Sequence, residues 1–345
     1  KLMKTDCGDI LISNSRKIEI KRIAFSFIPI ILFLMFYFLF ISSGPVTAHD
    51  TYKYTGILKE VSAGESDETP KAGKETHSAA NYVTLNKGEE LDLSFVKKSL
   101  GSDGASLSLS ENASLFERKQ KSYVLKAARA GYTRVSISAP GFKKNIYCFI
   151  SPLPSKHAGR NDINWYKTQY GTGRGNCGPA LISMAILWSK GVDVSVNSIR
   201  GEIGYPSPDG AINFEDMKNS LRRHQVHFSE ASIDSIDDLI RIITNDRLAL
   251  VLLNSGMIEE VKGDPRYNLF GRYYEDAGGH YILLKGYSFD KNYFIVYDPM
   301  PGDWAGNTMR YADGFSMIGA NRYYSSSNLF NALKTVNVLE IYRDF

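Results

Sequence analysis

Three residues of types used in covalent catalysis occur along the chain in the order cysteine, histidine, aspartate. The cysteine, Cys177, follows a glycine-rich loop and Asn176, and an apolar run begins directly after it with Pro179 near its start. This pattern predicts a helix that begins at Cys177 with Asn176 as its N-cap, because a proline in the first turn loses no helical hydrogen bond. The unpaired N–H groups and the helix dipole at that end favour a thiolate, the form that attacks carbonyl carbon. A small buried residue at a tight loop–helix junction is the structural alternative.

His280 and Asp298 begin and end a predicted β-hairpin whose strands are joined by a polar turn. Side chains alternate between the two faces of a strand, so the position of the turn decides whether these two residues meet. A turn centred on Phe289 places them directly opposite each other, and one centred on Lys291 offsets them by about four residues on one face. An even-numbered loop places them on opposite faces. Catalysis requires the first arrangement or one close to it, reached with the help of a bulge if necessary.

The order of the three residues suits a thiol nucleophile, its base and the group that orients the base. The chain has six histidines, and His280 is the one in a useful position for this chemistry. The others lie in linkers, in connections or in a charged run that predicts an exposed helix end: His49, His77, His157, His224 and His227. The last two have an i, i+3 spacing that would allow a metal pair, but no third ligand is near them in the sequence.

The motifs around these residues resemble those of papain-fold cysteine peptidases. They are Gln169 followed by Asn-Cys-Gly-Pro-Ala, then Gly-His before an apolar strand and Gly-Tyr, then Tyr-Asp-Pro. Within that fold, the region from about residue 158 to 345 is most similar to family 39, which includes the double-glycine leader peptidases of bacteriocin exporters. The resemblance implies a papain-like α+β domain that acts on a peptide or protein substrate.

The resemblance also implies a role for each matched residue. Cys177 is the nucleophile, His280 the base and Asp298 the group that orients the histidine, while Gln169 supplies a donor to the oxyanion hole. The backbone N–H of Cys177 is the second donor, since donors must point to where negative charge develops. Two spacings depart from the family pattern. Gln169 lies eight residues before Cys177, a longer gap than usual, and the gap from Cys177 to His280 is shorter than the roughly 130 residues of papain.

An uncharged segment rich in Phe, Leu and Ile precedes this region and predicts membrane attachment. Residues 23–41 span about 28 Å as a helix with a rise of ~1.5 Å per residue, close to the thickness of a hydrocarbon core. Four basic residues lie just before the segment and none follows it until Lys53. The positive-inside rule therefore places residues 1–22 in the cytoplasm and the catalytic domain on the extracytoplasmic side. We expect a single-pass signal anchor over residues 23–43, with a signal peptide cleaved after Ala48 as the alternative.

The region between this segment and the catalytic domain has two parts. Residues 44–80 combine many charges with few large apolar side chains, which predicts a flexible linker. Residues 81–153 predict a small all-β sandwich of short alternating strands, expected at 82–85, 91–95, 106–109, 122–125, 133–137 and 145–150. The run from Lys126 to Gly141 is similar to the end of bacterial Ig-like domains. These domains are usually adhesive or spacer modules, so the sandwich is a candidate for binding a surface partner.

The catalytic domain, residues 154–345, has a pattern of helices followed by a sheet. The helix of Cys177 is expected to end at Lys190, where Gly191 stops it. Further helices are expected at 214–221 and 236–243, and strands at 248–253, in the His280 hairpin and at 336–342. The fold class is α+β, with a helix that carries the nucleophile against a sheet that carries the base. Aromatic candidates for the wall of the cleft, which more often lie in a core, are Trp304, Tyr323 and Tyr324.

Composition limits the remaining choices. The 345 residues have a formal net charge of +4 and scattered basic residues, which gives no indication of a nucleic-acid surface. No phosphate-binding glycine motif and no zinc-like spacing of Cys and His occurs, so we expect no cofactor and no metal. The three cysteines cannot form a paired framework in an exported chain, which favours a bacterial protein.

Three functions fit these observations. The first is a membrane-anchored thiol peptidase that cleaves peptide bonds outside the cytoplasm. The second is another acyl transfer on the same fold, by a cell-wall amidase or a transglutaminase-like cross-linker, and the third is a binding or adhesion module without turnover. A nucleophile and a base serve water and amine acceptors alike, so they do not separate the first two functions. The complete set of Cys, His and Asp argues against the third.

Overall fold

The computed structural model describes most of the chain after residue 81. The described residues are 52–53, 82–93, 106–109, 116–118, 123–139, 142–159, 164–169, 175–205, 210–275, 277–302 and 309–343. All of them belong to one compact unit, residues 51–345. The predicted cytoplasmic segment 1–22, the predicted membrane span 23–43 and most of the predicted linker 44–80 lie outside the described residues. In the part of the chain that is described, no helix is long and apolar enough to span a membrane.

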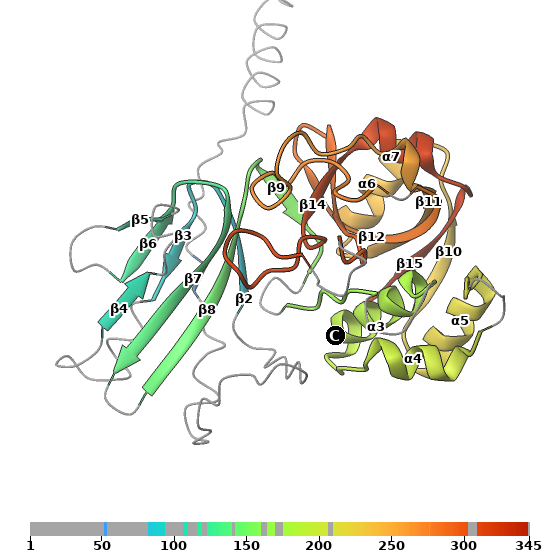
Figure 1. Cartoon of the computed structure of the whole chain (residues 1–345), viewed down its shortest axis with the longest axis horizontal. Coiled ribbons are helices and arrows are strands. Elements are labelled where there is room, and N and C mark those ends of the chain that lie inside the picture. Colours follow the sequence, from blue (N-terminus) through green and yellow to red (C-terminus); the bar gives the residue numbers. More distant parts are fainter. Residues whose placement is uncertain are drawn as a thin grey trace, which may run out of the picture. The chain divides into compact units, whose positions relative to one another are not determined.

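Two four-stranded sheets form a β-sandwich in the first half of the described residues (Figure 1). One sheet has the strand order β1-β3-β6-β5 and the other has the order β2-β8-β7-β4. The strands are β1 (Tyr52–Lys53), β2 (Tyr82–Asn86), β3 (Glu90–Asp92), β4 (Ser106–Leu109), β5 (Phe116–Arg118), β6 (Val124–Ala127), β7 (Gly131–Ala139) and β8 (Phe142–Ser151). Apolar side chains from both sheets, among them Leu91, Leu125 and Ile137, form a core between them.

The six strands expected in this region are confirmed as β2, β3, β4, β6, β7 and β8. The sequence missed β5, because three residues are too few to show alternation. Tyr52 and Lys53 pair in parallel with Leu91 and Asp92 of β3. The linker prediction is therefore wrong at these two residues. They form a strand by pairing with β3, and the polar sequence around them does not indicate a strand. The similarity to Ig-like domains stays a prediction.

The sheet that contains β2, β8 and β7 buries both of its faces. Residues such as Val83 and Val135 point into the core of the sandwich. Their neighbours Tyr82 and Tyr132, together with Phe149, instead belong to the large core of the C-terminal region. Because side chains alternate along a strand, the same strands contribute to two cores.

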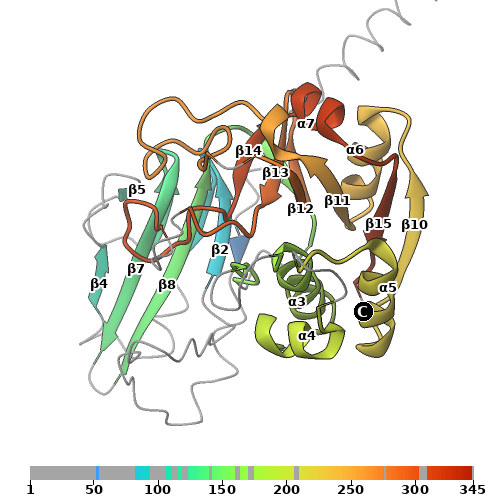
Figure 2. The same cartoon turned by 45° about the vertical axis from the view of Figure 1, so that its right-hand side comes forward.

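The C-terminal region is built on a seven-stranded sheet with the order β10-β15-β11-β12-β13-β14, in which β9 also pairs with β12 (Figure 2). All pairings among these described strands are antiparallel. The strands are β9 (Ser155–His157), β10 (Phe228–Ser232), β11 (Leu248–Asn254), β12 (Gly279–Ser288), β13 (Tyr293–Tyr297), β14 (Arg322–Ser325) and β15 (Asn337–Ile341). The sheet carries the predicted base at the start of its longest strand, β12.

A helix that is apolar on all sides lies at the centre of this region. It is α3 (Cys177–Lys190), buried from its second residue to Ser189 and ended by Gly191 in the left-handed conformation, as predicted. It packs against β12 and two other helices. The remaining helices are α4 (Val196–Ile203), α5 (Phe214–Arg223), α6 (Ile236–Thr244), α7 (Ser326–Ala332) and the 3-10 turn η3 (Ser255–Met257). The predictions of α3, α5 and α6 are confirmed, and α4 and α7 were not predicted.

The hairpin of β12 and β13 contains a β-bulge that decides which way His280 and the side chain after β13 face. Near the turn, Tyr287 pairs with Phe294, a register that would place the histidine at the start of β12 and the aspartate after β13 on opposite faces. The register then shifts by one residue, so that Leu283 pairs with Tyr297. In the shifted register the histidine and the aspartate share a face. The sequence left the register of this hairpin open, and the bulge brings the two residues to one face.

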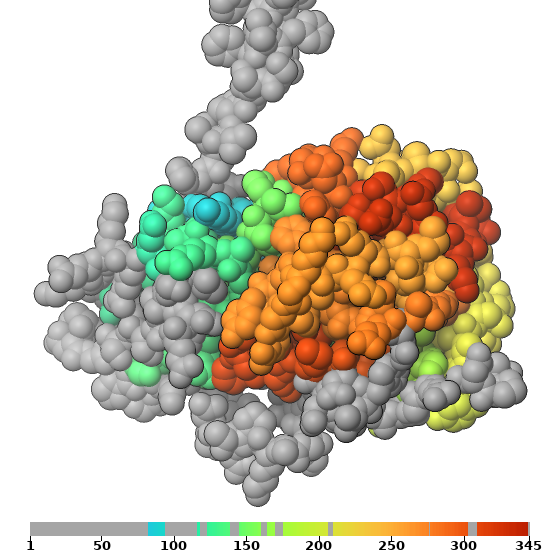
Figure 3. Space-filling view, turned by 45° about the horizontal axis from the view of Figure 1, so that its top comes forward, coloured from blue at the N-terminus to red at the C-terminus, as the bar shows by residue number. Residues whose placement is uncertain are grey.

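The connection between η3 and β12 pairs through its backbone with the edge strand β14. Its residue Phe270 forms a bridge with Tyr323 of β14, and the N–H of Gly271 donates to the carbonyl of Tyr323 over 2.9 Å. In Figure 3 this connection forms the broad light-orange surface. It positions Tyr273 and Tyr274 beside the segment that follows β13.

Candidate active site

Cys177 is the first residue of α3, and it is partly exposed. The preceding loop reaches the helix through Gly175, whose φ of +75° is unfavourable for other residues. A Cβ atom at this position would overlap the carbonyl oxygen of Gly210. The close approach of these two loop segments therefore fixes the path of the chain into the cysteine.

A buried arginine from α4 holds the same loop. Arg200 donates from Nε to Oδ1 of Asn176 over 2.6 Å, and from Nη2 to the carbonyls of Gly175 and Gly210 over 2.5 and 2.9 Å. Asn176 precedes the helix as expected, but its side chain makes no capping hydrogen bond. The N-cap prediction is therefore wrong in its chemistry, because the amide oxygen is used by Arg200 instead.

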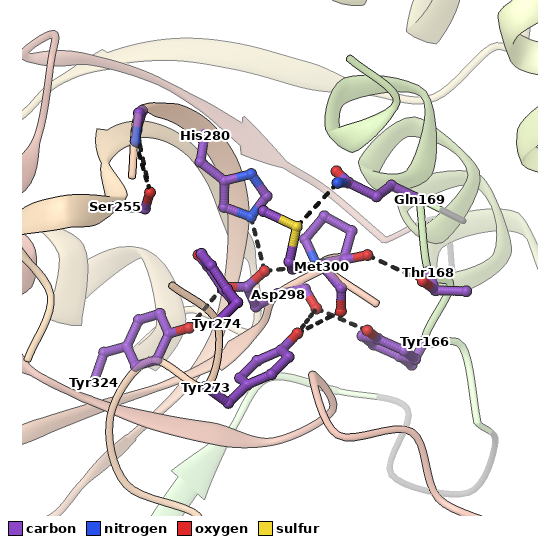
Figure 4. A network of polar contacts seen from close by, with 12 residues as sticks. Tyr166, Thr168, Gln169, Ser255, Tyr273, Tyr274, His280, Asp298, Met300 and Tyr324 are labelled. Atoms are coloured by element: carbon purple, nitrogen blue, oxygen red, sulfur yellow. Dashed lines mark hydrogen bonds and ion pairs between the residues drawn. The ribbon is translucent and has the colours of Figure 1, made fainter. Parts of the chain in front are cut away.

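His280 and Asp298 meet in the interior of the domain. His280 Nε2 lies 2.7 Å from Asp298 Oδ1, which also accepts a hydrogen bond from the backbone N–H of Met300 over 3.0 Å (Figure 4). The other carboxylate oxygen accepts hydrogen bonds from the hydroxyls of Tyr274 and Tyr324, over 3.0 and 2.6 Å. Asp298 is fully buried, and four donors satisfy its carboxylate.

The backbone of Asp298 is held as firmly as its side chain. Its N–H donates to the carbonyl of Gly319 over 3.0 Å. Its carbonyl accepts hydrogen bonds from the hydroxyls of Tyr166 and Tyr273, over 2.7 and 3.2 Å. These contacts come from three separate parts of the chain, so the orientation of the aspartate depends on the fold of the whole domain.

The electrostatics of the site favour a thiolate beside an imidazolium. Burial raises the pKa of the Cys177 thiol. A hydrogen bond with His280 and the charge of His280 lower this pKa by a larger amount, so the net shift is downward. Burial lowers the pKa of His280, but the charge and hydrogen bond of Asp298 outweigh this and raise it to about 10. Burial raises the pKa of Asp298, and the neighbouring His280 brings it below its ordinary value. The three groups therefore stabilise one another in their charged forms.

Gln169 lies against the segment that follows Asp298. Its backbone N–H donates to the carbonyl of Pro299 over 2.7 Å, and its side-chain Nε2 donates to the sulfur of Met300 over 3.1 Å. Figure 4 shows this sulfur between the ring of His280 and the amide of Gln169. The structure thus brings Gln169 to the same cluster as the histidine and the aspartate.

Several residues of this cluster were not identified from the sequence. Arg200 and Met300 carry no sequence signal for their contacts, since both depend on tertiary packing. The sequence indicates Tyr324 only as a candidate for the cleft wall, and the structure gives it a hydrogen bond to Asp298. Trp304 lies outside the described residues. His224, one of the pair considered as metal ligands, lies 2.9 Å from a carboxylate oxygen of Glu202.

No potential metal-binding group of three His, Cys, Asp or Glu residues occurs within the described ranges. The cluster instead contains a thiol, an imidazole, a carboxylate and an amide. These groups are suited to covalent acyl transfer, in which the thiol attacks and the imidazole moves the proton.

Residues 161–330 match the Peptidase_C39 like family. Among solved structures, the peptidase domain of Streptococcus ComA, described as a bi-functional ABC transporter involved in quorum sensing, is 12% identical with a TM-score of 0.33. That match covers 52% of this chain and 100% of the ComA domain. A putative C39-like peptidase from Bacillus anthracis is 10% identical with a TM-score of 0.31, covering 52% of this chain and 94% of its own. No curated protein sequence matches this chain.

Proposed function

We propose that this protein is a cysteine peptidase that acts through Cys177, His280 and Asp298, and the match of residues 161–330 to the Peptidase_C39 like family supports this. One observation carries the proposal. A neighbouring buried imidazole lowers the pKa of a partly exposed thiol at the start of a helix, and Nε2 of that imidazole lies 2.7 Å from a buried carboxylate. This is the arrangement that a thiol nucleophile, its base and an orienting acid require.

The geometry supports a distinct role for each residue. Since His280 directs Nε2 to Asp298, its Nδ1 is left to serve the thiol. The Cys177 thiolate attacks the carbonyl carbon of a peptide bond, and the His280 imidazolium then protonates the leaving amine. Water, deprotonated by the neutral imidazole, releases the acyl group from the sulfur. Asp298 keeps the imidazole in the required tautomer and orientation throughout.

The negative charge that develops on the carbonyl oxygen needs two donors. The backbone N–H of Cys177 lies at the start of α3, where it has no partner within the helix. Gln169 is the proposed second donor. Its amide bonds to a thioether, which is a weak acceptor, so exchange of that contact for an oxyanion costs little.

We further propose that the chain is a single-pass bacterial membrane protein anchored through residues 23–43, with the peptidase domain outside the cytoplasm. The uncharged segment and the basic residues before it support this orientation. Protease added to intact cells should then degrade the Cys177 domain, and the full-length chain should fractionate with membranes. A soluble secreted product that begins near His49 would replace the anchor with a cleaved signal peptide.

The peptidase proposal is tested by single substitutions in the full chain, assayed on a peptide library. Cys177→Ala should abolish turnover, and His280→Ala should be nearly as severe, because no other groups replace them. Asp298→Ala should leave measurable activity, and Gln169→Ala should lower kcat about 10²–10³-fold with little change in KM.

Cys148→Ala provides the matched control. It removes a thiol that is fully buried in β8, so turnover should be retained. Full activity of Cys177→Ala would end the peptidase proposal.

A further inference from the structure

One segment of the chain has the aspartate of the active site at its start and the β-sandwich against its end. It begins at Asp298 after β13 and finishes at Asn321 before β14. Figures 1 and 2 both show its second part, in red, lying along β7 and β8. Its last three residues, Gly319, Ala320 and Asn321, contact both Asp298 and the sandwich, and they are called the link below.

The link holds the aspartate through Gly319. The carbonyl of Gly319 accepts the N–H of Asp298 over 3.0 Å. A Cβ atom at this glycine would overlap the carbonyl oxygen of Asp298 and would crowd the hydroxyls of Tyr166 and Tyr273. A displacement of Gly319 therefore displaces the backbone of Asp298, because no free space lies between them.

The sandwich holds the same link through two tyrosine hydroxyls. Tyr132 of β7 donates to the carbonyl of Ala320 over 2.9 Å. Asn321 donates from Nδ2 to the hydroxyls of Tyr132 and Tyr82 over 2.9 and 3.0 Å. The ring of Tyr132 also stacks on that of Tyr311, with the ring centroids 4.6 Å apart.

These contacts are buried, and they constrain the backbone. Asn321 is fully buried, and its φ of +52° lies in the left-handed region, which Asn tolerates better than most residues. Its side-chain oxygen accepts a hydrogen bond from Lys285 over 2.8 Å. The carbonyl of Ala320 also accepts the hydroxyl of Tyr311 over 2.9 Å, so it keeps one donor if Tyr132 loses its own. Loss of either the Tyr132 or the Tyr82 hydroxyl would instead remove an acceptor from the buried amide of Asn321, which favours a rearrangement of the link.

We propose that the β-sandwich positions the catalytic aspartate: Tyr132 and Tyr82 fix Gly319–Asn321, and Gly319 fixes Asp298. This inference rests on the proposed peptidase function. It makes the sandwich part of the catalytic unit, and Tyr132 and Tyr82 positioning residues that act through Asp298 on His280.

The test uses Tyr132→Phe and Tyr82→Phe in the full chain, with Tyr147→Phe as the matched control. Tyr147 lies on the same face of the same sheet, with its ring 5.8 Å from that of Phe315. No hydrogen bond of its hydroxyl occurs among the residues the structure describes. All three substitutions remove one oxygen and keep the ring, and circular dichroism confirms that each variant is folded.

Two readouts are measured for each variant. The first is kcat and KM on a peptide substrate, and the second is the pH profile of Cys177 alkylation, which needs no substrate. Tyr132→Phe should lower kcat about tenfold with little change in KM, because small misplacements of catalytic groups are costly. It should also move the acid limb of the alkylation profile to higher pH, because an imidazolium in a poorer position stabilises the thiolate less. Tyr82→Phe should act in the same direction, and Tyr147→Phe should match the wild-type chain.

The outcomes separate this inference from the peptidase proposal. If wild-type Cys177 alkylates like an ordinary thiol, both are overturned. If wild-type Cys177 reacts at low pH but Tyr132→Phe and Tyr82→Phe behave like Tyr147→Phe, the peptidase proposal stands and the positioning role is refuted.

Discussion

At the scale of single residues, the site depends on how the charges of Cys177, His280 and Asp298 are shared. The pKa of the cysteine is lowered and that of the histidine is raised to about 10, in both cases through contacts within the cluster. Helix position alone would favour a thiolate. The buried carboxylate adds more, because it stabilises the imidazolium beside the sulfur.

The two described cysteines should therefore differ in reactivity. Cys148 is fully buried in β8, and burial raises its pKa. We expect Cys177 to react with iodoacetamide at neutral pH while Cys148 reacts only after unfolding, as measured by mass spectrometry of tryptic peptides. Equal labelling of the two in the folded protein would contradict the thiolate assignment.

The pH dependence of turnover should reflect the same pair. Activity should fall on the acid side as the thiolate is protonated, at a pH below the ordinary thiol value of 9.0. It should fall on the alkaline side near pH 10, where His280 loses its proton. A kcat/KM profile from pH 4 to 11 measures both limbs, which belong to the coupled pair as a whole. An alkaline limb near the ordinary histidine value of 6.5 would contradict the ion pair.

Tyr324 tests the support of Asp298. Its hydroxyl donates to Oδ2 over 2.6 Å, and this contact helps to lower the pKa of the carboxyl group. Tyr324→Phe should reduce the free energy of unfolding at pH 7 by about 1–3 kcal/mol, because a buried charged acceptor loses a donor. The stability from Asp298 is present above the ordinary carboxyl pKa and is lost as pH falls through the lowered value, so in the variant the loss should begin at higher pH.

Urea unfolding between pH 3 and 7 measures this change. Tyr287→Phe is the matched control, because the hydrogen bond of its hydroxyl is with Thr244 near the surface. The control should stay within about 0.5 kcal/mol of the wild type. Equal stability of the Tyr324 variant and the control would show that the hydroxyl does not support Asp298.

At the scale of elements, the approach of the loop to α3 determines where Cys177 lies. Gly175 has a φ of +75° and packs against the backbone of Gly210, and Arg200 bonds to both carbonyls. The helix itself is specified by its apolar sequence. The position of its first residue is specified by this loop, whose contacts come from α4 and from the segment before α5.

Gly175→Ala should therefore lower both stability and activity. The substitution strains the backbone and forces the loop away from Gly210, so we expect a loss of more than about 1 kcal/mol and a lower kcat. Gly201→Ala is the matched control: Gly201 lies in α4 with no atom within 4 Å of an added Cβ. It should raise stability by about 0.5–1 kcal/mol, because alanine favours a helix over glycine. Thermal unfolding and peptidase assays of the two variants decide the point.

At the scale of the whole described unit, the sandwich and the C-terminal region share a buried polar cluster. Lys285, the residue at the bulge of β12, is fully buried and donates to Asn321, which in turn contacts Tyr82 and Tyr132. Burial lowers the pKa of Lys285 to about 7. Lys285 therefore joins this cluster through a side chain whose pKa is lowered toward neutrality.

Lys285 should make stability rise with pH. Between about pH 7 and the ordinary lysine value of 10.5, the unfolded chain binds a proton here that the folded protein does not. Relative to Lys285→Met, the wild-type chain should gain up to about 1.4 kcal/mol per pH unit in this window. Urea unfolding of both proteins at pH 7, 8 and 9 measures the difference. If the two free energies of unfolding change with pH in parallel, the lowered pKa of Lys285 is refuted. The neighbouring His157 should not interfere, since burial lowers its pKa well below its ordinary value.

The sequence by itself determined the elements with a clear period and the identity of the chemical groups. The apolar run after Cys177, the stop at Gly191 and the alternation in β2, β7 and β8 predicted these elements correctly, because helix and strand periods are properties of local sequence. The types and the order of Cys177, His280 and Asp298 indicated thiol chemistry, because the chemical group that each side chain carries can be read directly from the sequence.

Only the tertiary structure decided how these groups meet. The bulge in β12 sets the faces of His280 and Asp298, and no local pattern specified it. Tyr274, Tyr324, Arg200 and Gly319 reach the site from distant parts of the chain, and the two faces of the β2-β8-β7 sheet separate its side chains into two cores. Such contacts depend on packing between elements, which a period of two or of 3.6 residues does not encode.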